Sequence, residues 1–148
     1  RIGAALSQGI ALGIGIPTVA VPTMHAMAWR AFSTGIWREN QTGFATLASR
    51  KGHVYVGAFV MQEGLVREQM APSSSTIYDL NALEMAISSP ERPICRFGYL
   101  GTSCLPTAAD IATLMPLFAD IPNSSPEPLY VTAFERQHST KPLPIEFR

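Results

Sequence analysis

The sequence predicts an α/β fold in which helices pack on a mixed β-sheet. In the middle of the chain, three apolar and β-branched runs separated by short turns indicate an antiparallel meander. Segments with helical spacing alternate with single strands before and after it. This combination is typical of a mixed sheet covered by helices. With 148 residues, the chain forms one domain or two small lobes.

The chain opens with a glycine-rich segment that has no formally charged side chain between Arg1 and Arg30. Its first part predicts a buried helix that ends at Gly13–Gly15. Its next part predicts a short buried strand, Thr18–Val21. This strand has helices on both sides and no evident partner, and a lone strand of this length is unstable.

The opening segment is long enough to span a bilayer, but its composition disfavours a membrane helix. Pro17 and Pro22 interrupt it, and the polar pair Ser7-Gln8 lies inside it. Two cysteines, Cys95 and Cys104, form neither a disulfide framework nor a zinc pattern. We therefore expect a cytoplasmic protein that does not associate with membranes.

The meander is expected to turn at Arg50–Gly52, where glycine supplies the backbone angle of a tight hairpin. Residues 72–76 are expected to form a loop, and 137–148 a loose tail. The expected elements after the opening segment are helix Met24–Ser33 capped by Thr23, strands Phe44–Ser49, His53–Met61 and Leu65–Met70, helix Ile77–Ile87, strand Pro93–Leu100, helix Pro106–Phe118 and strand Leu129–Val131.

The sequence offers little chemistry of its own. Eleven basic and eleven acidic residues cancel, which gives no basic surface for nucleic acid. The three histidines, His25, His53 and His138, lack metal-ligand spacing. The loop Gly101–Cys104 carries no nucleophile motif, and turn residues ahead of a helix explain it equally well. We predict no catalytic residue and no metal ligand.

The spacing in the opening helix is more informative. Gly3 and Ser7 are four residues apart, as are Gly9 and Gly13, and small residues at this interval allow another helix to approach closely. A separate apolar stripe consists of Ile2, Leu6, Ile10 and Ile14. A helix with two non-polar faces is covered by its own fold, or by its own fold and a partner. Both alternatives stay open. The candidate partner interface comprises Ile2, Gly3, Leu6, Ser7 and Ile10.

The stretch RIGAALSQGIALGIGIPTVAVPTMHAMAW resembles the helix–strand–helix of the bacterial TsaB (YeaZ) family. The hairpin Ala48–Phe59 is similar to the family's "DAR-x-GEVYxAxY" pattern. Leu105–Ala112 resembles its "P-x-A-x-x-(I/L)A" helix, and Glu127–Val131 stands where the family ends with "P-x-Y-(L/V)R". These matches run in order along the whole chain.

The resemblance implies half of an actin-like/Hsp70-like ATPase fold, with a ribonuclease-H-like mixed sheet and flanking helices. The family has a further N-terminal lobe ahead of the residue that matches Arg1. We therefore expect a C-terminal fragment. Residues 1–33 would be the last helix–strand–helix of the first lobe, 34–136 the second ribonuclease-H-like lobe, and 137–148 a C-terminal tail.

The resemblance also implies a non-catalytic scaffold subunit. Such proteins pair with themselves or with the catalytic subunit TsaD through first-lobe helices, which include the one that opens this chain. Together with the ATPase TsaE, the complex modifies tRNA by transferring a threonylcarbamoyl group to the adenosine beside the anticodon. The implied partners are TsaD and TsaE, with a homodimer as a further option and tRNA bound only indirectly. ATP and metal are expected in the partner subunits, and no cofactor in this chain.

Two positions depart from the family pattern. Ala48 stands in place of its Asp, and His53 in place of its Glu, so a polar role at these positions is in doubt. The hairpin motif keeps Arg50, Gly52 and Tyr55. Two other functions remain as alternatives: a glycoprotease-like metallopeptidase, which needs a metal pair or a nucleophile, and a small α/β binding domain without enzymatic activity.

Overall fold

The computed structural model describes residues 2–119, with side chains from residue 5 onward. Within this range the elements are α1 (Ile2–Ile14), α2 (Thr23–Ser33), β1 (Thr42–Ala48), β2 (His53–Gln62), β3 (Leu65–Thr76), α3 (Leu80–Ile87), β4 (Ile94–Gly98) and α4 (Ala108–Ala119). The predicted strand Leu129–Val131 and the predicted tail lie outside the described residues.

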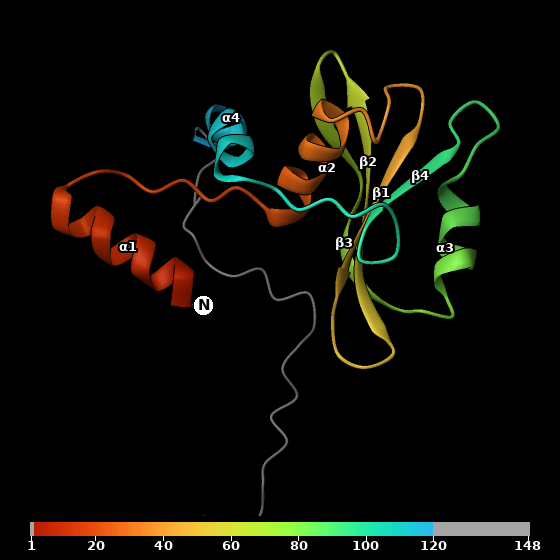
Figure 1. The fold of residues 1–148 in the computed structure, drawn as a ribbon, viewed down its shortest axis with the longest axis horizontal. Coiled ribbons are helices and arrows are strands. Elements are labelled where there is room, and N and C mark those ends of the chain that lie inside the picture. The colour runs from red at the N-terminus through yellow and green to blue at the C-terminus, as the bar shows by residue number, and fades with distance from the viewer. Residues whose placement is uncertain (1, 120–148) are drawn as a thin grey trace, which may run out of the picture.

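The four described strands form one mixed sheet in the order β3-β2-β1-β4 (Figure 1). β1, β2 and β3 make the antiparallel meander, while β4 returns through α3 to pair in parallel with β1. This arrangement confirms the predicted fold class, an α/β fold with a mixed sheet and flanking helices.

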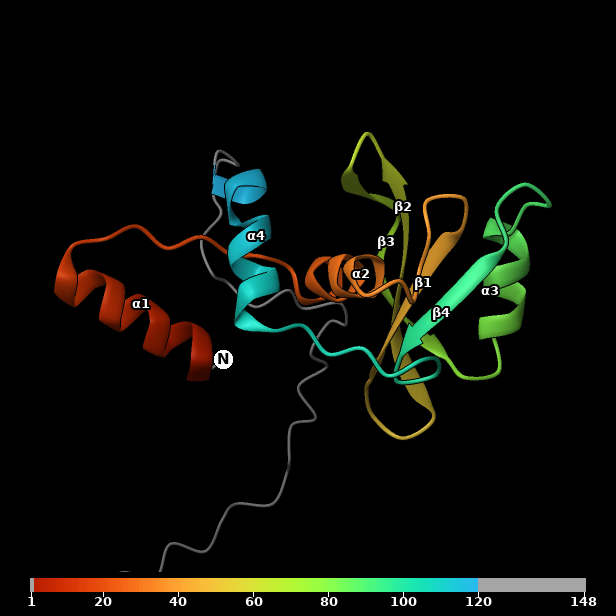
Figure 2. The same ribbon diagram turned by 45° about the horizontal axis from the view of Figure 1, so that its top comes forward.

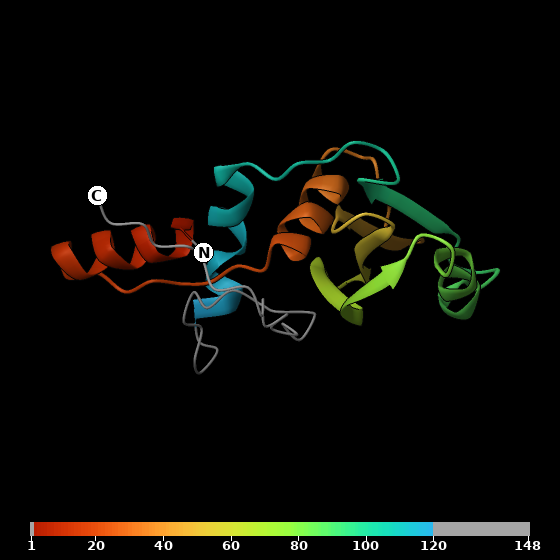
Figure 3. The ribbon, with the colours of Figure 1, turned by 90° about the horizontal axis from the view of Figure 1, so that it is seen from below.

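The helices cover both faces of the sheet. Figure 1 and Figure 2 show α2 against one face and α3 against the other. α4 packs on the outer side of α2, and α1 lies beyond α4, at the end of the molecule far from the sheet (Figure 3). The described part of the chain thus becomes less tightly packed from the sheet towards α1.

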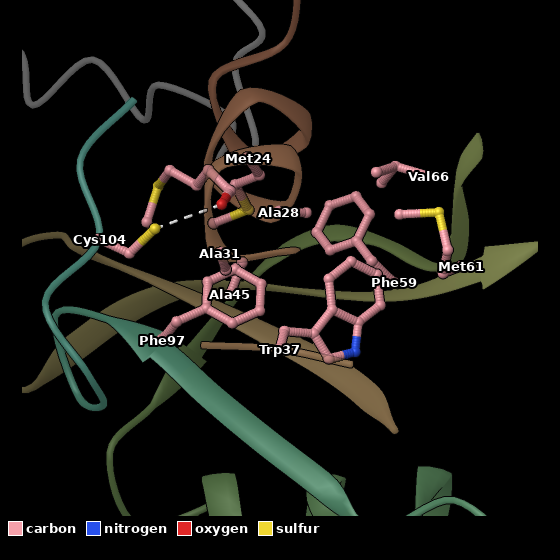
Figure 4. Close-up of a cluster of buried hydrophobic side chains, with 11 residues drawn as sticks. Met24, Ala28, Ala31, Trp37, Ala45, Phe59, Met61, Val66, Phe97 and Cys104 are labelled. Atoms are coloured by element: carbon pink, nitrogen blue, oxygen red, sulfur yellow. Dashed lines mark hydrogen bonds between the residues drawn. The ribbon is translucent and has the colours of Figure 1, made fainter. Parts of the chain in front are cut away.

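The main core lies between α2 and the sheet, and Figure 4 shows most of its side chains. The residues that α2 turns towards the sheet, Met24, Met27, Ala28 and Ala31, are all buried. The other buried members of this cluster are Trp37, Ala45, Phe59, Met61, Val66, Phe97 and Cys104. A second cluster on the opposite face comprises Phe44, Val54, Val56, Ala58 and Leu80.

Strand β3 is longer than predicted. The expectation of a loop at residues 72–76 is wrong, because Ser73–Thr76 pair with His53–Val56. Two register shifts opposite residues 56–59 place extra residues on β3, so the strand bulges where Pro72 lies. Proline has no N–H to donate and is tolerated at a bulge on an edge strand, which is where β3 stands among the described strands.

The predicted strand Thr18–Val21 is also wrong. These residues are half-buried and form no strand, because no described strand offers its backbone to them. Thr23 does not cap α2 as expected. It lies in the first turn, and Pro22 takes the cap position without a side-chain hydrogen bond. α2 ends as predicted, at Ser33.

Two helices begin later than predicted. α3 starts at Leu80 because residues 77–79 form a turn after the extended β3, and Leu80 is its one fully buried residue. α4 starts at Ala108 rather than at Pro106. The cap of α4 explains this start, since Thr107 and Asp110 satisfy each other's backbone N–H groups.

Candidate functional site

Helix α1 carries the predicted partner interface on an open surface. Leu6 is 62% exposed and Ile10 is 55% exposed, and Ser7 is exposed beside them. Ile2 and Gly3 belong to the first turn, where the structure describes the backbone alone. The structure therefore groups the described members of this set on one helix, and leaves their apolar side chains uncovered by other described residues.

The exposed apolar surface of α1 extends beyond the five residues of the predicted partner interface. Ile14 is 65% exposed, and Leu12, on another side of the helix, is 87% exposed. Ala11 is the single buried residue among the described side chains of α1. No other described helix or strand packs extensively against α1. Exposed aliphatic side chains gathered on one uncharged helix are typical of a surface that associates with a partner.

The hairpin motif lies elsewhere, at the turn between β1 and β2. Gly52 adopts φ +78°, which confirms the tight turn, and the carbonyl of Arg50 accepts a hydrogen bond from the His53 N–H at 2.9 Å. Tyr55 lies on β2, half-buried against the main core. α4 stands between this sheet and α1, so the hairpin and α1 do not share a surface (Figures 1 and 2).

A pocket of about 280 Å³ opens between α4, β3 and α2, and the sequence did not reveal it. His25 of α2, Glu68 of β3 and Phe118 of α4 are among its lining residues. These residues are far apart in the sequence, and His25 has no partner at ligand spacing. No local signal could have brought the three together.

His25 is the least satisfied polar group of this pocket. Its Nε2 lies 3.9 Å from a Glu68 carboxylate oxygen, and its buried Nδ1 has no hydrogen-bond partner in the described part of the chain. The imidazole makes edge contacts with Phe59 and Phe118, at centroid distances of 4.9 and 5.4 Å. Burial lowers the pKa of His25 below its ordinary value of 6.5, while the charge of Glu68 raises it by less.

Asp110 fixes the start of α4 and ties it to α2. Its Oδ2 accepts hydrogen bonds from the backbone N–H and the hydroxyl of Thr107, both at 2.7 Å, and lies 3.9 Å from the Arg30 guanidinium. Burial raises the pKa of the Asp110 carboxyl. The hydrogen bonds from Thr107 and the charge of Arg30 outweigh this effect, so the pKa lies below its ordinary value of 3.8.

Replacing Asp110 by Asn should therefore weaken the docking of α4 in a pH-dependent way. A carboxyl with a lowered folded-state pKa adds stability above its unfolded pKa, and this stability is lost as the pH falls through the folded pKa. We expect Asp110→Asn to cost about 0.3–1 kcal/mol at pH 7, because the amide keeps an acceptor oxygen but removes the negative charge near the helix N-terminus.

The measurement is urea unfolding of both proteins at pH 7 and pH 3. The difference in free energy of unfolding should be smaller at pH 3 than at pH 7. A difference of the same size at both pH values would contradict the assigned role of the carboxylate charge.

The two cysteines are held as thiols in the fold. Cys104 is buried and donates a hydrogen bond to the Met27 carbonyl at 3.4 Å (Figure 4). Cys95 donates to the Ile36 carbonyl at 3.1 Å. Burial raises the pKa of both thiols, which keeps the nucleophilic thiolate scarce at neutral pH.

Over residues 2–119, no group of three or more His, Cys, Asp or Glu side chains is arranged to hold a metal ion. None of the described helices combines the length and the apolar character needed to cross a membrane.

Comparison with solved structures adds the fold relationship. YeaZ from Pseudomonas aeruginosa matches with a TM-score of 0.55 and 22% sequence identity. A Pseudomonas aeruginosa protein described as similar to the peptidase YeaZ matches with a TM-score of 0.56 and 23% identity. No protein-family model matches the sequence, and no curated protein sequence matches it.

Both structural matches cover 79% of this chain and 58% of the matched chain. The chain therefore spans less than two thirds of the length of these neighbours. Identities of 22–23% show a shared fold and not a shared activity. Over the part that matches, this chain has a YeaZ-like fold.

Proposed function

We propose that this chain acts as a non-catalytic, TsaB-like scaffold subunit that binds a TsaD subunit through α1. In this proposal TsaD and TsaE supply ATP, metal and catalysis, and the complex transfers a threonylcarbamoyl group to the adenosine beside the anticodon of tRNA. This chain binds no cofactor and meets tRNA only through its partners. Two lines of argument support the proposal: the resemblance of its motifs to the TsaB family, and its YeaZ-like fold.

The observation that carries the proposal is the uncovered apolar surface of α1. A helix of 13 residues is marginal in water by itself, and most helices are stabilised by burying an apolar face. Leu6 and Ile10 lie on one side of α1 and are exposed. Burying a Leu or Ile side chain against a partner contributes about 1.5–3 kcal/mol, which gives this surface a strong tendency to associate.

The peptidase alternative would need a metal site or an activated nucleophile. The described residues favour neither. The thiol of Cys104 donates to a backbone carbonyl and its pKa is raised, and no described cluster of His, Cys, Asp and Glu has the size of a metal site.

Charged substitutions on α1 test the interface. We expect Leu6→Asp and Ile10→Asp each to weaken binding to a bacterial TsaD at least about 100-fold, because burying an unpaired carboxylate costs several kcal/mol. Isothermal titration calorimetry with purified TsaD measures the effect.

Gln8→Asp is the matched control, because it adds the same charge to an exposed polar position of the same helix. It should bind like the wild type. Equal binding by all three variants would reject α1 as the interface, and equal loss in all three would show a general charge effect rather than a contact.

A further inference from the structure

We propose that protonation of His25 controls the docking of α4. The neutral imidazole holds the C-terminal half of α4 against α2 and β3, and the imidazolium, protonated on both nitrogens, releases it. This inference concerns the docking of α4 and does not rest on the proposed function. It follows from three observations: the aromatic contacts of His25, its buried unpartnered nitrogen, and the pocket beside it.

The first observation is that His25 joins three elements. It lies on α2, its ring edge contacts Phe59 of β2 at 4.9 Å between centroids, and its other contact is Phe118 of α4 at 5.4 Å. Few other side chains between residues 5 and 119 anchor this end of α4. Leu114 is buried, whereas its helix neighbours Met115 and Leu117 are 48% and 45% exposed. Among the described residues, the contact between His25 and Phe118 therefore helps to hold the end of α4.

The second observation concerns where an added proton would go. Nε2 faces the Glu68 carboxylate at 3.9 Å, which favours the neutral tautomer with its hydrogen on Nε2. Nδ1 is then an acceptor, and leaving an acceptor unpaired is tolerable. Protonation converts Nδ1 into a buried N–H donor, for which the described residues provide no acceptor. Burying such a group without a partner is unfavourable.

The charges around His25 do not cancel this effect. From β3, the charge of Glu68 favours the imidazolium, and Arg67 lines the same pocket. β2 and the end of α4 contribute Phe59 and Phe118, which carry no charge. The acidic residue of α4, Asp110, already faces Arg30 at the other end of the helix. Burial of the ring outweighs the attraction of Glu68, in agreement with the lowered pKa of His25.

The third observation is that the pocket gives the ring a route to solvent. The pocket of about 280 Å³ separates α4 from β3, so the end of α4 can move outward without breaking a strand. When Phe118 leaves, His25 becomes hydrated and binds a proton more readily. By linkage, acid then favours the released state. One linked proton allows the released population to rise up to about tenfold per pH unit between the docked pKa and about 6.5.

The test is an NMR titration of the full chain from pH 7.5 to 5.0, which follows the His25 ring and the backbone amides of residues 114–118. We expect the ring to titrate below pH 6.5 and the amides to shift with the same midpoint. His25→Phe keeps an aromatic ring without a titrating group. In this variant the amides should not shift over that range.

Two variants on α4 complete the test. Phe118→Ala should move the His25 midpoint towards 6.5, because it removes part of the burial. Met115→Ala shortens an exposed side chain of the same helix outside the pocket, and should leave the midpoint unchanged. The proposal is overturned if His25 titrates at or above 6.5, if the amides do not follow the ring, or if they shift equally in His25→Phe.

Discussion

Replacing Gly98 by Ala is expected to destabilise the fold by at least about 3 kcal/mol, because backbone strain of about 1–3 kcal/mol adds to a direct overlap with the next strand. Gly98 ends β4 with φ +94°, a conformation that side chains rarely adopt. A Cβ atom there would lie 2.2 Å from the Thr46 carbonyl oxygen and 2.7 Å from Cε of Met27. Removing these two overlaps requires β1, β4 or α2 to move.

The overlap at Gly98 also disturbs a buried polar network. The Thr46 hydroxyl donates to the Phe97 carbonyl at 3.1 Å and accepts from the Leu100 N–H at 2.9 Å. Both bonds depend on the close approach of β1 and β4. A shift that makes room for a Cβ would lengthen them inside the core, where unpaired polar groups are costly.

Urea unfolding followed by circular dichroism measures the effect at Gly98. Gly9→Ala is the matched control, since Gly9 lies inside α1 and a Cβ there meets nothing within 4 Å. We expect this control to be neutral or to stabilise the chain by about 0.5–1 kcal/mol. A Gly98→Ala protein as stable as the wild type would contradict the described close pairing of β4 with β1.

Replacing Trp37 by Ala is expected to cost about 3–5 kcal/mol, the range for removing a large buried aromatic side chain. Trp37 is 1% exposed, and its ring lies 6.1 Å from Phe97 and 5.9 Å from Phe32, measured between centroids. Its Nε1–H donates to the Gln41 carbonyl at 2.9 Å, which fixes the connection between α2 and β1. Truncation therefore leaves a cavity and frees this connection.

Thermal and urea unfolding of Trp37→Ala test this value. Tyr78→Ala serves as the control, because Tyr78 is a large aromatic residue that is 91% exposed. Its replacement should change the free energy of unfolding by less than about 0.5 kcal/mol. If both substitutions cost the same, Trp37 does not have the packing described for it.

Periodicity predicted most of the fold. α2 followed from apolar residues at helical spacing, and the hairpin from β-branched runs on both sides of Arg50–Gly52. These signals are local, and the structure confirms them to within two residues at each end. The parallel pairing of β1 with β4 carries no local signal, but it is what gives the mixed sheet its topology.

The errors came from residues whose state depends on distant neighbours. Pro72 and the serines after it favour a loop locally, yet they extend β3 because His53–Val56 offer backbone groups to pair with. The strand expected at Thr18–Val21 fails for the opposite reason, since no described strand lies beside it. Strand formation is decided by pairing more than by propensity.

The candidate functional residues were likewise predicted only in part from the sequence. Helical spacing and the lack of charge predict α1 and its small and apolar faces. The expectation that this helix is buried is wrong for the described residues, because Ala11 alone is buried among the described side chains of α1. The role of His25 needed the structure, since its neighbours Glu68 and Phe118 come from other elements. A lone histidine in an apolar helix gives no sign of which residues will surround it.

The most direct test of partner binding by α1 is the molar mass of this chain mixed with a bacterial TsaD, measured by size-exclusion chromatography with light scattering. If α1 is a partner-binding helix, one peak will carry the summed mass of the two subunits, and Leu6→Asp will split it while Gln8→Asp will not. Two separate peaks at unchanged masses, from a chain that circular dichroism shows to be folded, would contradict the proposal that this chain binds TsaD through α1.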